Sequence, residues 1–282
     1  AGIGAEFPEA SDGMVRLWDV QTGELINRFQ HDITVWHVAY SPDGQFIATG
    51  DSTGIVQIWH IQTGNVAQTF LRDEGELFTS SLAYSHDGQS VLAGYLSKDN
   101  HDYGKIIVWD IATGERLLEI NHKANYAIYS PDGQFIATGG VDLALWDAQT
   151  GEQLHDFPID ADIYDLAYSP DGQFLVAPLS RDENIAIYDA QTGDVIDLMR
   201  GHDEIVMNVD YSPDGRFLIS HSWDKTIKVW DMTERQVIHT LTGYNGYINA
   251  TVFSPDVSQV ATSQDHRVWM WDIQALASYQ TV

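Results

Sequence analysis

Three side chains in the second half of the chain are of the types that hydrolases combine for nucleophilic catalysis. His202, Ser220 and Asp224 would supply a general base, a nucleophile and a carboxylate that orients the base. A working nucleophile must also be exposed beside an oxyanion hole. The chemistry that is open to these residues therefore depends on the elements that position them.

The segment that holds these residues is one copy of a repeat. The tetrapeptide SPDG, or a close copy, begins at six serines spaced 39 to 45 residues apart (Ser41, Ser85, Ser130, Ser169, Ser212 and Ser254). A second marker, WD with the variants WH and YD, keeps step with it at seven positions (Trp18, Trp59, Trp109, Trp146, Tyr188, Trp230 and Trp271). Self-similarity at a fixed period indicates a repeat architecture.

Each repeat reads as four short strands. In the unit that begins at Gly201, residues 205–212 have the alternating pattern of a strand, and the following SPDG supplies turn residues. Residues 216–222, 226–231 and 236–241 are three further strand-like runs. No longer segment has an apolar period of 3.6 residues, so the pattern predicts an all-β array of about 27 or 28 strands.

The GH…SPDG…SxDxxIxVWD pattern of residues 201–231 resembles the WD40-repeat family, in the style of its bacterial repeats, and the resemblance runs from Trp18 to the end. It implies a seven-bladed β-propeller of four-stranded antiparallel blades. The whole chain, residues 1–282, would be one domain, with blades ending near residues 30, 70, 120, 157, 200, 241 and 282. Stacked blades cover one another's faces, and radial closure protects the sheet edges.

The opening blade lacks an evident first strand. Residues before Gln30 hold material for the second, third and fourth strands, whereas residues 271–282 align with 59–70 and complete their own blade. Either the first blade has three strands, or residues upstream of Ala1 belong to the native protein. We expect the second, because the chain also begins without Met and without a signal-peptide pattern.

In the WD40 family, a His, a Ser or Thr, an Asp and the Trp of one repeat form a buried hydrogen-bonded tetrad. The resemblance assigns this structural role to His202, Ser220, Asp224 and Trp230. Buried polar groups have to be paired, and a buried serine is not available to a substrate. We therefore predict that the chain has no catalytic residues and is not an enzyme.

The resemblance places partner contacts where the first strand of each blade begins and the second ends. The binding residues expected there are Trp36, Phe78, Asn125, Tyr164, Arg181, Met207, Trp223, Tyr247 and Asn249. Six of them, the aromatic residues and Met207, are expected to be exposed around one channel mouth. Aromatic residues and Met are typical of interface centres, so we predict a scaffold that binds a protein or peptide.

The charge of the chain narrows the class of partner. Fourteen Lys and Arg against 41 Asp and Glu give a net charge of −27. This excess argues against nucleic acid and anionic membranes and favours a basic partner, although a solvated acidic surface or salt adaptation gives the same balance. The sequence has no run of 18 apolar residues that could span a membrane and no Cys for a disulfide or thiolate site.

Two acidic loops are candidate ion sites: the insertion with Asp99, His101 and Asp102, and residues 155–162. Neither has a recognised ligand spacing, so we predict no metal and no cofactor. Two other functions stay open. The chain could be the C-terminal sensor or autoinhibitory domain of a larger signalling NTPase or kinase, or a small-ligand or glycan-binding propeller that uses Asp162, Lys123 and Arg181. We expect a monomeric cytoplasmic domain, with an extracellular location and membership of a longer chain left open.

Overall fold

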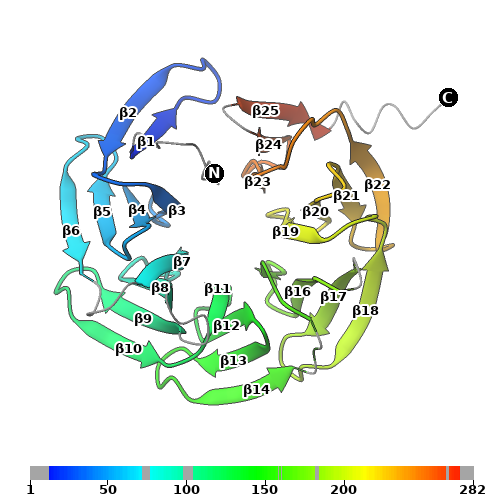
Figure 1. Ribbon diagram of the computed structural model, residues 1–282, viewed down its shortest axis with the longest axis horizontal. Helices are drawn as coiled ribbons and strands as arrows, with labels where there is room; N and C mark the ends of the chain where they lie inside the picture. Colours follow the sequence, from blue (N-terminus) through cyan, green and yellow to red (C-terminus); the bar gives the residue numbers. More distant parts are fainter. Residues whose placement is uncertain are drawn as a thin grey trace. The chain divides into compact units, whose positions relative to one another are not determined.

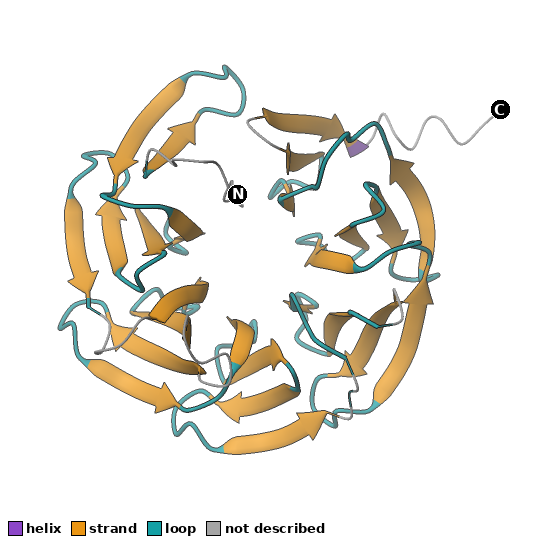
Figure 2. Cartoon of the chain, viewed as in Figure 1, coloured by secondary structure: helices purple, strands orange, loops and turns teal. Residues whose placement is uncertain are grey.

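The computed structural model describes residues 13–71, 77–97, 104–157, 159, 161–181, 184–264 and 267–273. Its regular elements are 25 β-strands, which pair in antiparallel sheets (Figure 2). Short runs of alternating or β-branched residues, closed every few positions by Gly, Pro and Asp, leave no room for a longer helix. Among the described residues, no helix has the length and apolar character needed to cross a membrane.

The chain divides into two compact units, and one of them comprises residues 5–129 and 149–151. It holds the pair β1-β2, the four-stranded sheets β3-β4-β5-β6 and β7-β8-β9-β10, and the strand β11 (Figure 1). The bounds are β1 (Met14–Trp18), β2 (Leu25–Gln30), β3 (Val35–Tyr40), β4 (Phe46–Asp51), β5 (Val56–His60), β6 (Val66–Phe70), β7 (Leu77–Tyr84), β8 (Ser90–Ser97), β9 (Gly104–Asp110), β10 (Arg116–Ile120) and β11 (Ala124–Tyr129).

The other unit comprises residues 1–4, 130–148 and 152–282. It contains β12-β13-β14, the four-stranded sheets β15-β16-β17-β18 and β19-β20-β21-β22, and the three-stranded sheet β23-β24-β25. The bounds are β12 (Phe135–Gly140), β13 (Leu143–Asp147), β14 (Gln153–Phe157), β15 (Ala167–Tyr168), β16 (Phe174–Leu179), β17 (Asn184–Asp189), β18 (Val195–Arg200), β19 (Val206–Tyr211), β20 (Phe217–Ser222), β21 (Ile227–Asp231), β22 (Gln236–Leu241), β23 (Ala250–Phe253), β24 (Gln259–Gln264) and β25 (Arg267–Asp272).

The SPDG tetrapeptide makes the same turn wherever it occurs. Ser212 Oγ donates a hydrogen bond of 2.6 Å to Asp214 Oδ1, and the equivalent bond is present in all six copies. Gly215 has φ of 71°, in the left-handed region that glycine adopts without a steric penalty. In the copy that begins at Ser254, Val257 occupies this position with φ of 59°, which is costly for a β-branched residue. The motif thus reverses the chain between the first two strands of every described sheet except β1-β2.

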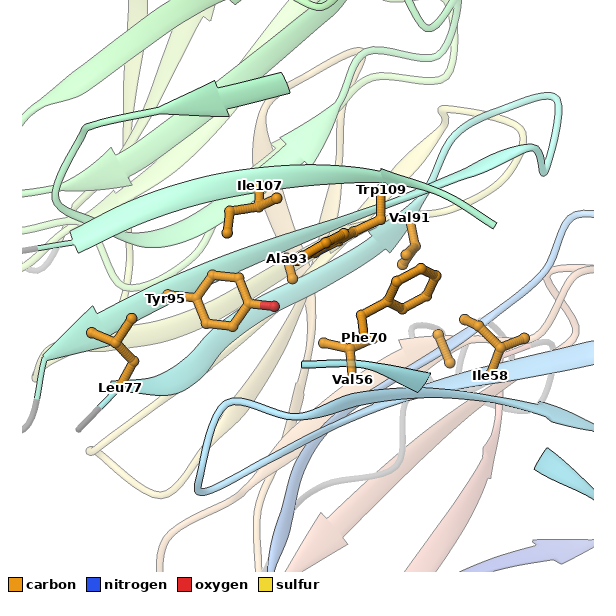
Figure 3. Packing of buried hydrophobic residues seen from close by; sticks show 10 residues of the cluster. Val56, Ile58, Phe70, Leu77, Val91, Ala93, Tyr95, Ile107 and Trp109 are labelled. Carbon is orange, nitrogen blue, oxygen red and sulfur yellow. The ribbon is translucent and has the colours of Figure 1, made fainter. Parts of the chain in front are cut away.

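Apolar side chains fill the space between neighbouring sheets within each unit. One buried cluster joins β3–β6 to β7–β10 (Figure 3), and its core members are Ala48, Val56, Ile58, Phe70, Leu77, Val91, Ala93, Tyr95, Ile107 and Trp109. In the other unit, a comparable cluster joins β15–β18 to β19–β22 and includes Ile187, Met199, Leu218 and Trp230. A sheet on its own would expose these faces, so adjacent sheets stabilise each other.

The structure confirms the predicted all-β class and the four-stranded antiparallel sheets. Seven blades of four strands each were predicted, but the described sheets do not all have four strands. Within the described residues, six sheets have three or four strands and the first has two. The second strand expected in the opening blade falls on residues 1–12, and the fourth strand expected in the last blade falls on residues 274–282. Both segments lie outside the described residues.

Candidate binding surfaces

The four side chains expected to form a tetrad lie in one chain of hydrogen bonds on the sheet β19–β22. Trp230 Nε1–H, on β21, donates to Ser220 Oγ, on β20, at 2.8 Å. Ser220 Oγ lies 2.8 Å from His202 Nε2, and His202 Nδ1 lies 2.8 Å from Asp224 Oδ2. The set therefore connects the loop before β19, the turn after β20 and the third strand of the sheet.

These same contacts exclude a nucleophilic role for Ser220. Its side chain is completely buried (0% exposed), and its oxygen already accepts the indole N–H. Burial lowers the pKa of His202, despite the opposing effect of Asp224, so that the imidazole is neutral at pH 7. Burial tends to raise the pKa of Asp224, but hydrogen bonds from Thr226 and His202 outweigh it and the carboxylate stays ionised. The arrangement has the residue types of a triad without access for a substrate.

Other sheets keep parts of this arrangement. The indole-to-hydroxyl pairs are Trp59–Thr49 at 2.9 Å, Trp146–Thr138 at 2.9 Å and Trp271–Thr262 at 3.1 Å. Tyr244 takes the place of the histidine in the last of these, with its hydroxyl 3.0 Å from Thr262 Oγ1. In the sheet β7–β10, Ala93 stands where the hydroxyl would be, and Trp109 Nε1 has no hydrogen-bond partner in the described part of the chain.

Two of the predicted binding residues pack against each other in the first of the two units. Trp36 on β3 and Phe78 on β7 have ring centroids 4.8 Å apart in an edge-on arrangement. Both side chains are half-buried, so the expectation that they are exposed is wrong. They cover each other because they lie on first strands of adjacent sheets. Asn125 lies on β11, and its side chain is outside the described part of the structure.

In the unit that contains residues 152–282, a second aromatic pair is exposed. Trp223, in the turn between β20 and β21, is 43% exposed, and Tyr247, in the loop between β22 and β23, is 64% exposed. Their ring centroids are 6.0 Å apart and the ring planes are tilted by 53°. Two large aromatic side chains from neighbouring sheets thus form one apolar surface, which we call the Trp223–Tyr247 pair.

The other predicted binding residues of this unit are less accessible, with one exception. Tyr164, Met207 and Asn249 are half-buried, which corrects the expectation that Tyr164 and Met207 are exposed. They lie beside completely or largely buried residues at the starts of first strands, where neighbouring sheets approach each other. Arg181 is exposed in the turn after β16. Only part of the expected set therefore presents its side chains to solvent.

The turn that carries Trp223 is held against an acidic loop. The backbone N–H of Trp223 donates to the carbonyl of Ile205 at 3.0 Å, and Ser222 Oγ donates to the carbonyl of Glu204 at 2.9 Å. The preceding residue, Asp203, donates its N–H to Asp224 Oδ2 at 3.1 Å. The side chains of Asp203 and Glu204 are exposed. Carboxylates therefore border the aromatic surface on a loop that several hydrogen bonds hold in place.

The sequence pattern did not identify a buried carboxylate, Asp165, next to the first strand β15. Asp165 is buried beside β15, and its Oδ2 accepts hydrogen bonds from Asn208 Nδ2 and from the backbone N–H of Val209. Asn208 Oδ1 in turn accepts from Thr251 Oγ1 at 2.7 Å. Burial raises the pKa of Asp165 to about 7, against the effect of these hydrogen bonds. A polar residue within the apolar pattern of a first strand was the available signal.

The candidate ion sites remain untested by the structure. Asp99, His101 and Asp102 lie outside the described residues, as do two positions within 155–162. Across the described ranges, no three His, Asp or Glu side chains gather in a way that could hold a metal ion. Asp162 and Arg181, considered for a small-ligand site, lie on neighbouring exposed turns, and Ser180 Oγ accepts the N–H of Asp162 at 3.0 Å.

Two models of known protein families match this chain. The family model of the NWD2 C-terminal β-propeller matches residues 9–210, which is more than half of the chain. The WD-domain G-β repeat matches residues 193–231 and 235–272. The chain belongs to the WD-repeat β-propellers. The sheets of this propeller are accordingly its blades, and within the described residues five of the seven sheets have the four antiparallel strands that the repeat pattern predicted.

Curated relatives are similar to this WD-repeat propeller over about 70% of its length. Periodic tryptophan protein 2 of Arabidopsis thaliana is 25% identical over 211 residues, which are 72% of this chain and 23% of that protein. WD repeat and SOCS box-containing protein 1 of Danio rerio is 30% identical over 214 residues, 72% of this chain and 50% of the fish protein. The propeller thus spans half or less of the length of these relatives.

Proposed function

We propose that this propeller is a non-enzymatic module that binds a protein or peptide through the Trp223–Tyr247 pair. The observation that supports the proposal is the exposure of two large aromatic side chains, 6.0 Å apart, on turns that are fixed by hydrogen bonds. Rigid aromatic side chains contribute large contact areas at a small cost in conformational entropy, and interface centres are enriched in them. WD-repeat propellers also serve as interaction scaffolds, which agrees with this reading.

The residues that resemble a catalytic triad serve the fold of their own sheet. Ser220 is buried and hydrogen-bonded by its tryptophan, and its imidazole and carboxylate partners are engaged within the same sheet. The tetrad therefore stabilises the blade that presents Trp223. Asp224 belongs to the tetrad and directly follows Trp223 in the chain, so the structural set and the exposed surface are linked through one turn.

A selection of peptides on the intact chain tests the proposal. A displayed library of random peptides is selected on the immobilised protein, and enriched peptides are synthesised and titrated by calorimetry. We expect the double variant Trp223→Ala and Tyr247→Ala to weaken binding of these peptides by at least tenfold. The matched control is Val195→Ala with Leu198→Ala, which removes two exposed apolar side chains from the outer strand β18 of the same unit.

The control double variant should bind as the wild type does. Circular dichroism and urea unfolding of both double variants show whether the fold is intact. Enriched peptides that bind the Trp223→Ala, Tyr247→Ala protein with unchanged affinity would place recognition elsewhere on the molecule. A selection that enriches nothing would contradict the proposal for peptides altogether.

A second candidate function is that of a sensor or autoinhibitory domain within a longer signalling protein. The family model that matches most of the chain is named for a C-terminal propeller, and the relatives above are at least twice as long as the aligned segment. The test is to sequence the gene upstream of the Ala1 codon. A continuing reading frame that encodes a phosphate-binding loop or kinase motifs would favour this candidate, and a start codon directly before Ala1 would contradict it.

A further inference from the structure

We infer that the Trp223–Tyr247 pair and its acidic border recognise the guanidinium group of an arginine in a bound peptide. This inference rests on the proposed function and adds the chemistry of the recognised side chain. The occupant is a basic peptide segment in extended form, with one arginine placed against the two rings. Three features of the described residues carry the inference: the aromatic surfaces, the local charge, and a buried hydrogen-bond donor.

The aromatic surfaces suit a planar cation. The two ring centroids lie 6.0 Å apart, the ring planes are tilted by 53°, and both side chains are exposed. A guanidinium group stacks on the face of Trp or Tyr, where the ring quadrupole attracts a positive charge. Arginine is favoured over lysine at such a surface because its group is planar and less strongly hydrated than an ammonium.

The charges on the same turn and loop are mostly negative. Asp203 and Glu204 are exposed on the loop that is hydrogen-bonded to the Trp223 turn, and Asp224 follows Trp223 directly. Lys225, which comes next, is also exposed and offsets one of these charges. Three carboxylates against one ammonium leave a local excess of negative charge, in line with the net charge of −27 for the whole chain. A cation is therefore attracted and a peptide carboxylate is repelled.

A buried amide near the Tyr247 loop lacks an acceptor in the part of the chain that the structure describes. Asn249, two residues after Tyr247, donates its N–H to the carbonyl of Ser263 at 2.8 Å. The next residue on β24 is Gln264, which is 8% exposed and whose Nε2 has no hydrogen-bond partner within the described residues. An unpaired buried donor is costly, and a rotation of the Gln264 side chain would let it donate to a main-chain carbonyl of a bound peptide. This donor favours a peptide over a free cation.

The test uses short peptides that differ in one group. The probes are terminally blocked Gly-Gly-Arg-Gly-Gly and the same peptide with citrulline, which keeps the shape of arginine and removes its charge. The indole N–H resonance of Trp223 is assigned in the ¹⁵N-labelled chain by its loss in Trp223→Phe, and its shift is followed during titration. We expect the arginine peptide to shift this resonance at concentrations at least tenfold lower than the citrulline peptide.

A charge variant with a matched control completes the test. Glu204→Gln should weaken binding of the arginine peptide by about twofold to fivefold, the range that corresponds to an exposed ion pair. Glu234→Gln removes an exposed carboxylate from the turn between β21 and β22 and should have no effect. Added salt should reduce the affinity of the wild type for the arginine peptide.

The outcomes separate this inference from the proposed function. Equal shifts by the arginine and citrulline peptides would overturn guanidinium recognition. If neither peptide shifts the Trp223 resonance although library peptides still bind through the aromatic pair, the inference fails and the proposed function stands. If library peptides are also indifferent to the loss of Trp223 and Tyr247, both fail.

Discussion

Asp165 Oδ2 accepts a hydrogen bond of 2.9 Å from the backbone N–H of Val209, so that a carboxylate beside β15 is joined to the first strand of the neighbouring sheet. Asn208, next to Val209, donates to the same oxygen and accepts from Thr251 on β23. One buried side chain thus begins a polar connection across three successive sheets of one unit. Buried polar groups that are fully paired favour a single arrangement of the strands that hold them.

The pH dependence of stability should reveal this carboxylate. Burial raises the pKa of Asp165 to about 7, whereas the unfolded chain has the ordinary value near 3.9. Between these values the folded protein holds a proton that the unfolded protein has released, so Asp165 stabilises the fold less as the pH rises from about 4 to about 7. In Asp165→Asn this dependence is absent. In urea unfolding at several pH values, the free energy of unfolding of the variant should increase relative to that of the wild type as the pH rises. The increase should be up to about 1.4 kcal/mol per pH unit.

Asp43→Asn is the matched control for that experiment. A hydrogen bond from Ser41 lowers the pKa of Asp43, so the stability it contributes is lost only when the pH falls below about 4. The difference between this variant and the wild type should therefore stay constant from pH 5 to pH 8. Parallel stability curves for Asp165→Asn and the wild type over the same range would show that Asp165 is ionised in the folded state throughout.

A buried histidine should act in the opposite direction. Burial lowers the pKa of His221, on β20, to about 3, and the nearby His202 adds to the effect. Because the unfolded chain takes up a proton near pH 6.5 and the folded protein does not, His221 destabilises the fold as the pH falls from about 6.5 to about 3. His221→Leu should flatten the acid side of the stability curve. His86→Gln, which removes an exposed imidazole, is the control, and a slope that His221→Leu leaves unchanged would contradict the prediction.

Loss of the tetrad hydroxyl should destabilise the fold. Ser220→Ala leaves Trp230 Nε1 without its acceptor and His202 Nε2 without its partner inside a buried sheet. We expect the free energy of unfolding to fall by about 2–4 kcal/mol, since two buried polar groups are unpaired at once. Thr240→Ala removes an exposed hydroxyl from β22 and should change it by less than about 0.5 kcal/mol. Equal effects of the two substitutions in urea unfolding would contradict the role of the tetrad.

The sheet that lacks a hydroxyl offers a stabilising substitution. Trp109 Nε1 has no hydrogen-bond partner among the described residues. Ala93 has the same position in the sheet β7–β10 as Ser220 has in the sheet β19–β22. Ala93→Ser would give the indole an acceptor, and its hydroxyl could donate to the Ile107 carbonyl as Thr49 Oγ1 does to Gln57. We expect a gain of about 1 kcal/mol in the free energy of unfolding.

Ala48→Ser provides the comparison for Ala93→Ser. Ala48 is equally buried, on β4 of the neighbouring sheet, and a hydroxyl there faces the apolar cluster of Val91 and Trp109. It should cost about 1–3 kcal/mol, because it buries a polar group without a partner. A loss of stability in Ala93→Ser similar to that in Ala48→Ser would show that the packing around Trp109 leaves no room for the hydroxyl.

The sequence alone determined the repeat, the strand order and the tetrad. SPDG and WD recur because each blade makes the same two reversals, and Ser212, Asp214 and Gly215 form their turn from contacts within a few residues. His202, Ser220, Asp224 and Trp230 belong to a single sheet, so one repeat contains all that they need. Such local or single-sheet relationships follow from residue type and spacing.

Contacts between sheets decided what the sequence left open. Trp36, on a first strand, and Trp223, after a second strand, are both predicted to be exposed at the channel mouth. Yet Trp36 is half-buried against Phe78, while Trp223 is exposed beside Tyr247. The sequence does not show that Asp165 is buried and hydrogen-bonded. In the structure, the neighbouring strand provides Val209 N–H and Asn208 Nδ2 as its donors. Burial, pairing and pKa depend on groups 24 to 44 residues away in the sequence, and only the tertiary structure brings those groups together.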